Sequence, residues 1–473
     1  MYKLTKKTDI PAISYIKLPA SKSESNRVLI LQALFSFFQK DDRNIALKPI
    51  LRNISAANDT VVMQNLLEKI ARNQTTPNPS LESRGVLSPS LQGGARGGFN
   101  FENLILDTQD AGTTFRFLTA FCVATRTYAT LTGTPRMQER PIGILVDALR
   151  ELGADIEYLQ KDGFPPIQIK YFKQKTNQIT LKADVSSQFI SALLMIAPTL
   201  SNGLTINLIG KISSKPYIMM TLAQMQHFGI KNTYNIDNQS IRILYQKYKM
   251  WDFWIENDWS AASYWYLVAS LCPNKAFIIN GLKEISLQGD SKIIEIMQLF
   301  GVETIFFENS IEIRTTPSPS FEGEEQTPLL TKEGLEVVSN PIFIDFSDCP
   351  DLAQTIVALC AIKRITLKMS GLESLIIKET NRIEALNNEI NKIGCKLCKE
   401  DNYWYVKPIL DFKGDFSNIV FNTYDDHRMA MAFAPLALVL DNISIENPSV
   451  VRKSYPNFWE ELEKVCFFDH IDT

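Results

Sequence analysis

The sequence predicts a mixed α/β (α+β) protein that repeats one supersecondary unit six times. An amphipathic helical pattern followed by strand-like runs recurs along the chain, and a more apolar helical pattern recurs between its copies. The 473 residues, 45% of them hydrophobic, also suit two domains of ordinary size. Repetition on this scale indicates one reused βαβαββ unit of strand, buried helix, strand, surface helix and two strands.

The amphipathic copies predict surface helices, because their apolar residues recur at helical spacing. Four of them end in a glycine that suits a helix C-cap, namely Gly153, Gly229, Gly301 and Gly394. The six segments are DTVVMQNLLEKI (59–70), RPIGILVDALRELGADIEYL (140–159), KPYIMMTLAQMQHFGIKNTY (215–234), DSKIIEIMQLFGVETIFF (290–307), ETNRIEALNNEINKIGCKLC (379–398) and YPNFWEELEKVCFF (455–468).

The other copies predict buried helices, because they are apolar nearly all round. They are SKSESNRVLILQALF (21–35), AGTTFRFLTAFCVA (111–124), SSQFISALLMIAP (186–198), WSAASYWYLVAS (259–270), CPDLAQTIVALCAI (349–362) and DHRMAMAFAPLAL (426–438). Two segments rich in Pro, Ser and Gly interrupt the repeats at about 72–99 and about 314–336. We expect these two to be mobile surface inserts without a core of their own.

Composition argues against several classes of protein. A net charge of −3 gives no global positive field for nucleic acid, and no long apolar run predicts a membrane span. The N-terminus lacks the apolar run of a signal peptide, and seven scattered cysteines suit a reducing cytoplasm. The CxxC of Cys395 and Cys398 has no second pair and no nearby His, so no metal site is expected.

Residues suited to anion binding stand at the starts of predicted buried helices. Gly112 and Thr113 open one helix, and Ser186, Ser187 and Gln188 open another. Small and hydroxyl residues leave backbone N–H groups free for an anion, although Ser is also an ordinary N-cap.

Cations accompany these helix starts in a chain that is acidic overall. Each alone could be a snorkelling or salt-bridged side chain, but their recurrence at equivalent points of the repeats favours a shared anionic ligand. Arginine suits this role because its fork binds phosphate and carboxylate bidentately. The cations are Lys22, Arg27, Arg116, Arg140, Arg382, Arg428 and Lys453.

Two carboxylates, Asp351 and Glu379, are expected among these cations. Asp351 starts the helical segment PDLAQTIVAL, and Glu379 lies between Lys378 and Arg382. Asp351 could simply cap its helix, and Glu379 could form a surface ion pair. The alternative is that both are acid–base groups whose protonation the cations bias.

Nine motifs cover the chain outside the two inserts. They are LPASKSESNR, QDAGTTFRFL, LTGTPRMQERPIGILVDAL, SSQFISALLMIAP, SKPYIMMTL, LQGD, IIKETNRIEAL, YDDHRMAMAF and RKSYPNFWEEL. In this order they closely resemble the 5-enolpyruvylshikimate-3-phosphate (EPSP) synthases, also called 3-phosphoshikimate 1-carboxyvinyltransferases. The resemblance implies an inside-out α/β barrel of two domains, each with three repeats, buried helices and outer sheets. The first domain is expected over residues 21–255 and the second over residues 1–20 plus 256–473, with the active site in the cleft between them.

The resemblance also implies a reaction of the shikimate pathway, which leads to chorismate and the aromatic amino acids. The enolpyruvyl group of phosphoenolpyruvate passes to the 5-hydroxyl of shikimate 3-phosphate, and phosphate is released. The residues implied for shikimate 3-phosphate are Lys22, Ser23, Arg27, Ser186, Ser187, Ser214, Tyr217, Asp351, Ser374 and Lys378. Those implied for phosphoenolpyruvate are Lys22, Gly112, Arg140, Gln188, Arg382, Arg428 and Lys453.

The implied chemistry passes through a tetrahedral ketal. We assign Glu379 as the acid that faces the methylene carbon and Asp351 as the base that faces the hydroxyl, with Lys22 assisting. Each acid–base group would contribute about 10²–10⁴ in rate. No metal or organic cofactor is needed, and we expect a cytoplasmic monomer that binds small molecules. The family usually has Asp where this chain has Asn381, and some members have Asn in place of Ser374.

Two alternatives were weighed. UDP-N-acetylglucosamine 1-carboxyvinyltransferase shares the fold and phosphoenolpyruvate, but it usually has Asn where this chain has Ser23. It also typically has a reactive Cys in the region that matches GTPRMQERP, which has none. A non-catalytic anion-binding homologue would be free to lose Lys22, Asp351, Glu379 and Lys453, all of which are present.

Overall fold

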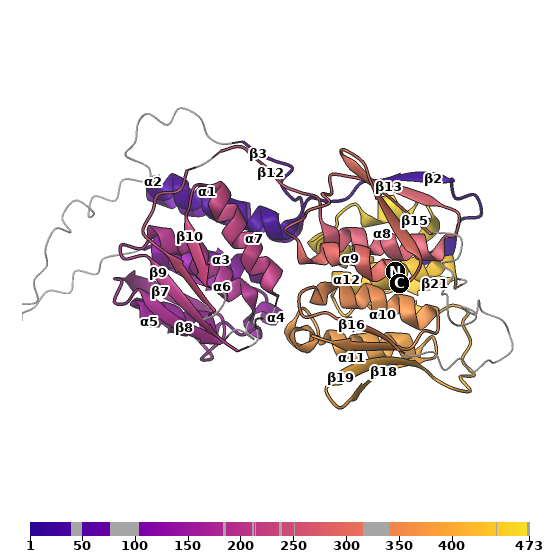
Figure 1. Cartoon of the computed structure of the whole chain (residues 1–473). Helices are drawn as coiled ribbons and strands as arrows, with labels where there is room; N and C mark the ends of the chain where they lie inside the picture. Colours follow the sequence, from indigo (N-terminus) through magenta and orange to yellow (C-terminus); the bar gives the residue numbers. More distant parts are fainter. Residues whose placement is uncertain are drawn as a thin grey trace, which may run out of the picture.

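The computed structural model shows a mixed α/β chain arranged as two lobes (Figure 1). It describes all residues except 39–49, 76–103, 183–185, 211, 213, 236–238, 250, 316–340, 441 and 471–473. The first lobe holds the segments from α1 to β12, and the second holds β1, β2 and the segments from α8 onward.

The predicted buried helices form the interior of the lobes. Because they are apolar on every side, they can pack against neighbours all round rather than along one stripe. They are α1 (Lys22–Phe38), α3 (Gly112–Ala124), α6 (Ser187–Ile196), α8 (Trp259–Leu271), α10 (Ala353–Ile362) and α12 (His427–Phe433). Three short 3₁₀ turns adjoin them, namely η1 (Ala197–Thr199), η3 (Pro350–Leu352) and η5 (Ala434–Leu438).

The predicted surface helices also form, each within or overlapping its expected segment. They are α2 (Asn58–Thr75), α5 (Gly143–Leu152), α7 (Lys215–His227), α9 (Ile293–Gln298), α11 (Arg382–Asn391) and α13 (Phe458–Leu462). Further short turns are α4 (Pro135–Gln138), η2 (Gly289–Lys292), η4 (Glu373–Ile377) and η6 (Pro448–Lys453). Gly153 ends α5 with a φ of 110°, a left-handed conformation that glycine adopts without strain.

Five four-stranded sheets in the described residues share one strand pattern. The first two strands of each sheet are parallel, and each later pair is antiparallel. In the first lobe they are β4 (Leu104–Asp107), β5 (Ala129–Thr132), β7 (Ile167–Phe172), β6 (Ala154–Tyr158), then β8 (Gln178–Lys182), β9 (Leu204–Ile209), β11 (Ser240–Ile243), β10 (Asn232–Asn235). A short parallel pair, β3 (Leu51–Arg52) with β12 (Phe253–Trp254), completes this lobe's described strands.

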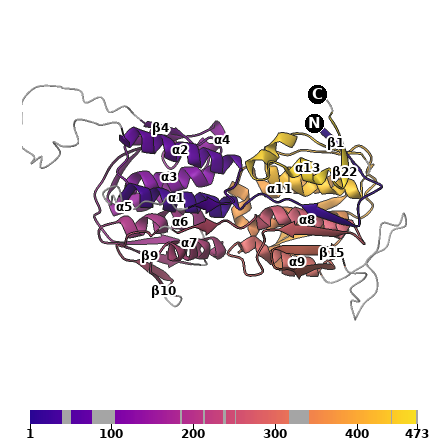
Figure 2. The same ribbon diagram turned by 90° about the horizontal axis from the view of Figure 1, so that it is seen from above.

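In the second lobe, strands from the N-terminus join sheets made by the C-terminal part of the chain. β1 lies between β21 and β22, with Tyr2 opposite Ile445 and His470, and β2 pairs with β13 (Figure 2). The sheets are β2 (Ile13–Ile16), β13 (Ala276–Asn280), β15 (Ser310–Thr315), β14 (Val302–Phe306); β16 (Ile342–Asp345), β17 (Leu367–Ser370), β19 (Tyr403–Pro408), β18 (Cys395–Glu400); and β20 (Val420–Phe421), β21 (Ile443–Ile445), β1 (Tyr2–Lys6), β22 (Cys466–His470).

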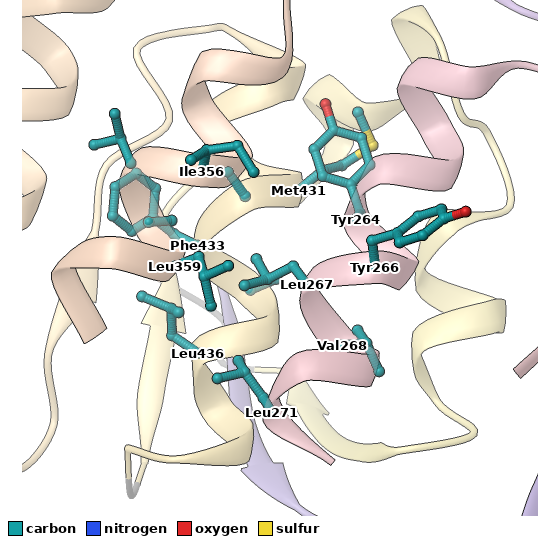
Figure 3. Packing of buried hydrophobic residues seen from close by; sticks show 14 of the residues in the cluster. Tyr264, Tyr266, Leu267, Val268, Leu271, Ile356, Leu359, Met431, Phe433 and Leu436 are labelled. Carbon is teal, nitrogen blue, oxygen red and sulfur yellow. The ribbon is translucent and has the colours of Figure 1, made fainter. Parts of the chain in front are cut away.

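Each lobe has its own hydrophobic core. One cluster of buried residues lies within 28–248, and the other lies within 4–18 and 259–466. Figure 3 shows the second core, where Leu267 of α8 lies near Leu359 of α10 and Leu436 of η5. The apolar helices therefore pack on one another in the middle of the lobe, while the sheets lie outside them.

The expected inserts lie largely outside the described residues. At their edges the structure corrects the boundaries, because residues 72–75 still belong to α2 and residues 314–315 to β15. In the described part of the chain, no helix combines the length and apolar character that a membrane crossing requires.

Candidate active site

A buried arginine gathers three carboxylates at the start of α11. The Arg382 guanidinium donates to Asp426 at 2.7 and 3.3 Å, to Asp351 at 2.8 Å and to Glu379 at 2.9 Å. Asn381 accepts a hydrogen bond from the N–H three residues further on, so it serves as the N-cap of α11. The family departure at this position therefore leaves the partners of Arg382 in place.

Three further cations surround the same carboxylates. Arg428 lies 3.0 Å from Asp351, Lys378 lies 3.5 Å from Asp351, and Lys453 lies 3.3 Å from Glu379. Helix α10 begins after Asp351 without a side-chain cap, so the capping interpretation of Asp351 is wrong. The Glu379 ion pairs are largely shielded from solvent rather than exposed on the surface, since its side chain is 13% exposed.

The charges hold both carboxylates ionised. Burial alone would raise the pKa of Asp351, but the two arginines and the lysine around it hold that pKa well below its usual range. Burial would also raise the pKa of Glu379, but Lys453, Arg382 and Arg140 together hold it well below its usual range. Arg140 belongs to the first lobe, so the first lobe acts electrostatically on Glu379 in the second.

Two arginines of the first lobe converge on the start of α3. A methyl group on Gly112 would lie 2.5 Å from NH1 of Arg116 and 2.6 Å from NH1 of Arg140. Within the described residues, Nε and NH1 of Arg116 and Nε of Arg140 are buried without a hydrogen-bond partner. Burial and the neighbouring Arg140 lower the pKa of Arg116 to about 9, although Glu379 opposes this shift. Buried cations without partners are costly, so this arrangement favours an anion between them.

The two lobes present their charges to each other. Lys22, the first residue of α1, lies 3.2 Å from Asp59. Burial lowers the pKa of Lys453, but Glu379 and then Asp59 of the other lobe raise it above its usual value. Burial and then Lys22 hold the pKa of His427 well below its usual value. The structure therefore brings predicted cations of both lobes to one place.

Arg27 lies one turn further along α1 and is engaged within its own lobe. Its Nε donates to Thr221 at 2.8 Å, NH2 to Ser191 at 3.3 Å and NH1 to the Ser23 carbonyl at 2.8 Å. Its guanidinium carbon lies 5.6 Å from the centre of the Tyr217 ring. Burial lowers the pKa of Arg27 to about 10. The structure thus groups Arg27 with the predicted residues Ser23 and Tyr217.

Other predicted residues lie at helix starts of the first lobe. Ser186 caps α6 by accepting from the N–H of Gln188 at 3.4 Å, and the Gln188 amide donates to Thr113 at 3.0 Å. This contact joins the starts of α6 and α3. Ser214 has a left-handed φ of 55° and donates its N–H to the carbonyl of Ser347, in the second lobe, at 3.0 Å.

Two predicted residues are not tied to the rest. Ser187 is buried in the first turn of α6, and Ser374 is half-buried in η4. Across the described ranges, neither donates or accepts a side-chain hydrogen bond with another predicted site residue.

Sequence reasoning missed two carboxylates that hold the cations. Asp426 is fully buried, and it accepts the N–H of Arg428 at 2.9 Å while it also binds Arg382. Asp59 is the partner of Lys22. The available signal for Asp426 was its place in YDDHRMAMAF, at the start of a helix predicted to be buried.

The fold and the site define a two-lobed α/β protein whose lobes share one site of dense, largely buried charge. Residues 11–462 match the family model described as EPSP synthase (3-phosphoshikimate 1-carboxyvinyltransferase), and the chain belongs to this family. It is 42% identical over 456 residues to a 3-phosphoshikimate 1-carboxyvinyltransferase of Bacteroides fragilis (strain YCH46), which covers 96% of this chain and 95% of the relative. It is 32% identical over 458 residues to one of Sulfurovum sp. (strain NBC37-1), with 96% of each covered.

Solved structures show the same fold. An EPSP synthase from Acinetobacter baumannii aligns with a TM-score of 0.69 over 99% of this chain and 100% of that one. At 16% identity this likeness concerns the fold alone. Family and relatives together make the chain an enzyme of the shikimate pathway with 3-phosphoshikimate 1-carboxyvinyltransferase activity, which confirms the predicted family and reaction. They do not favour the UDP-N-acetylglucosamine alternative.

Proposed function

We propose that the enolpyruvyl transfer from phosphoenolpyruvate to the 5-hydroxyl of shikimate 3-phosphate takes place where the charges of the two lobes meet. The observation that carries this proposal is the pair of buried guanidinium groups of Arg116 and Arg140 beside Gly112. Each substrate has a phosphate and a carboxylate, and a phosphate monoester alone carries about −1.5 to −2. Fixed cations offset the repulsion between two such reactants.

Phosphoenolpyruvate is assigned to the cations on both sides of Glu379. Arg140 offers a buried donor that lacks a protein partner among the described residues, and Lys453 and Arg382 adjoin Glu379 from the second lobe. An arginine fork suits both the carboxylate and the phosphate of this substrate. The full assigned set is Lys22, Gly112, Arg140, Gln188, Arg382, Arg428 and Lys453.

Shikimate 3-phosphate is assigned to the neighbouring helix starts. The cap of α6 and the grouping of Arg27, Ser23 and Tyr217 support this assignment, because hydroxyl and cationic groups there suit a phosphorylated sugar-like ring. The full assigned set is Lys22, Ser23, Arg27, Ser186, Ser187, Ser214, Tyr217, Asp351, Ser374 and Lys378.

The acid and base roles are assigned to Glu379 and Asp351, with Lys22 assisting. A proton adds to the methylene carbon while the hydroxyl oxygen bonds to the adjacent carbon and loses its own proton. The resulting ketal then loses phosphate and returns a proton from the methyl group. Glu379 is ionised beside Lys453 and Arg382, but anionic substrates that share those cations raise its pKa toward that of an acid. Asp351 stays ionised, as a base requires.

We also propose a division into domains of residues 21–255 and residues 1–20 plus 256–473. Two separate cores and one strand pattern shared by five sheets support this division and the six-repeat architecture. The enzyme is proposed to act as a cytoplasmic monomer on small molecules alone, without nucleic acid, metal or organic cofactor.

Phosphate release tests the proposed function. The purified chain is incubated with phosphoenolpyruvate alone, with shikimate 3-phosphate added, or with UDP-N-acetylglucosamine added. We expect inorganic phosphate only in the presence of shikimate 3-phosphate. Release that requires UDP-N-acetylglucosamine, or no release with either acceptor, contradicts the proposal.

A further inference from the structure

Arg136, on the short turn α4, bridges the two lobes beside the proposed acid. Its Nε donates to the backbone carbonyl of Glu379 at 2.8 Å, and NH2 donates to that of Lys378 at 3.1 Å. Its remaining nitrogen, NH1, pairs with Glu139 of the same segment at 2.8 Å. The Arg136 side chain is 46% exposed, so this contact lies at the rim of the interface between the lobes.

The two carbonyls belong to a connection rather than to a helix or strand. Residues 378–381 join η4 to α11. From these same residues the side chain of Lys378 reaches Asp351 at 3.5 Å, and that of Glu379 reaches Lys453 at 3.3 Å. A planar fork that donates to consecutive carbonyls fixes their orientation as well as their position. Holding this main chain therefore sets where both side chains point.

The segment that carries Arg136 is itself braced within the first lobe. Thr134 caps α4 by accepting the N–H of Met137 at 3.3 Å, and its hydroxyl donates to the carboxylate of Asp110. Arg140 follows four residues after Arg136, with its N–H donating to the carbonyl of Met137 at 3.1 Å. One short segment thus carries a residue assigned to phosphoenolpyruvate and a residue that grips the opposite lobe.

We propose that Arg136 is a positioning residue for the reaction. By binding the 378–379 main chain from the other lobe, it aligns Glu379 and Lys378 with Arg140 across the interface. The placement of the acid thereby depends on contact between the lobes. This inference rests on the roles proposed above for Glu379 and Lys378.

Arg136→Ala is the direct test, with Arg150→Ala as its matched control. Arg150 is 40% exposed and also donates from two nitrogens to a backbone carbonyl, that of Ile156 at 3.1 and 2.6 Å, but within its own lobe. We expect Arg136→Ala to lower kcat/KM for phosphoenolpyruvate about 100-fold, because a misplacement of about 1 Å can cost that much. Most of the loss should lie in kcat. Arg150→Ala should keep the wild-type constants, and both variants should unfold at the wild-type temperature.

Two further measurements separate positioning from general structural damage. Arg136→Lys keeps the charge but not the fork, so it should recover only part of the lost kcat. Millimolar guanidinium chloride should restore activity to Arg136→Ala, whereas sodium chloride of equal ionic strength should not. Wild-type kcat in Arg136→Ala, full recovery by lysine, or equal losses in the Arg136 and Arg150 variants would overturn the proposal.

The same assay distinguishes failure of this inference from failure of the proposed function. Wild-type enzyme that releases no phosphate with shikimate 3-phosphate refutes the function itself. Active wild type with an equally active Glu379→Gln refutes the role of Glu379, and with it this positioning role. Active wild type, a slow Glu379→Gln and an unaffected Arg136→Ala refute the inference alone.

Discussion

A methyl group added at Gly112 would meet both guanidinium groups at the start of α3. Each would lie less than 3.0 Å from the new carbon, so Arg116 and Arg140 must shift. We expect Gly112→Ala to raise KM for phosphoenolpyruvate about tenfold, which corresponds to roughly 1.4 kcal/mol of binding. KM for shikimate 3-phosphate should stay unchanged. Steady-state phosphate release with each substrate varied in turn measures both constants.

Gly143→Ala is the matched control for that substitution. Gly143 is also the first residue of a helix in the same lobe, but a methyl group there would lie 3.4 Å from Gly163, an ordinary contact. Its kinetic constants should therefore match those of the wild type. Equal shifts in the two variants would show that Gly112 has no special relation to the substrate.

Glu379→Gln tests the acid at the centre of the charge cluster. The amide keeps the shape of the side chain but cannot deliver a proton, so kcat should fall about 10²–10⁴-fold. Calorimetric titration should still show binding of both substrates. Glu384→Gln, an exposed residue in the first turn of α11, provides the control. Turnover near the wild-type rate in Glu379→Gln would remove the acid role from this residue.

Individual cations were predictable because each interrupts a motif of small or apolar residues at a helix start. Lys22, Arg140 and Arg382 fall in such positions, and the structure gathers them with their partners. Asp426 and Arg136 escaped prediction for a physical reason. A carboxylate before a helix is the ordinary N-cap, and an arginine that binds distant backbone carbonyls leaves no local pattern.

At the scale of elements, helices were easier to predict than strand pairing. Helical spacing of apolar residues is local, and each expected helical segment contains a helix. The agreement is weakest at α9 and α13, which are only 6 and 5 residues long. The position of β1 between β21 and β22 joins the two ends of the chain, which no local pattern encodes. Only the family resemblance placed the N-terminal strand with the second domain.

The N-cap of α11 offers a test at this scale. Asn381 accepts the N–H of Glu384 at 3.4 Å, directly before the arginine that gathers the carboxylates. Asn381→Ala should lower the free energy of unfolding by about 1 kcal/mol, whereas Asn381→Asp, which keeps the acceptor, should stay within about 0.5 kcal/mol of the wild type. Urea titrations measure both values. Equal stability of the alanine variant and the wild type would mean that the cap contributes nothing to folding.

At the scale of the whole molecule, two chain segments cross between the lobes side by side. Ser21 donates its N–H to the carbonyl of Glu256 at 2.8 Å, and Ala20 forms an isolated bridge with Asn257. Glu24 lies at this crossing, where its carboxylate accepts the N–H of Glu256 at 3.3 Å. The buried crossing thus brings two carboxylates together with little room for water.

Burial and then Glu256 raise the pKa of Glu24 from 4.5 to about 7, with Asp258 adding to the shift and Lys283 opposing it. A carboxyl group with a raised folded-state pKa binds its proton more tightly in the folded protein. Its stabilising effect is therefore complete below about pH 4.5 and is lost as the pH rises through about 7.

Glu24→Gln should remove this dependence, since the amide imitates the protonated acid at every pH. Relative to the variant, the wild type should lose up to about 3 kcal/mol of unfolding free energy between pH 4.5 and pH 8. Urea titrations across this range measure the difference, and Glu68→Gln, on the exposed face of α2, is the control. Parallel curves for Glu24→Gln and the wild type would mean that Glu24 keeps an ordinary pKa. The crossing would then have to hold an ionised, solvated carboxylate, which its burial and its neighbour Glu256 argue against.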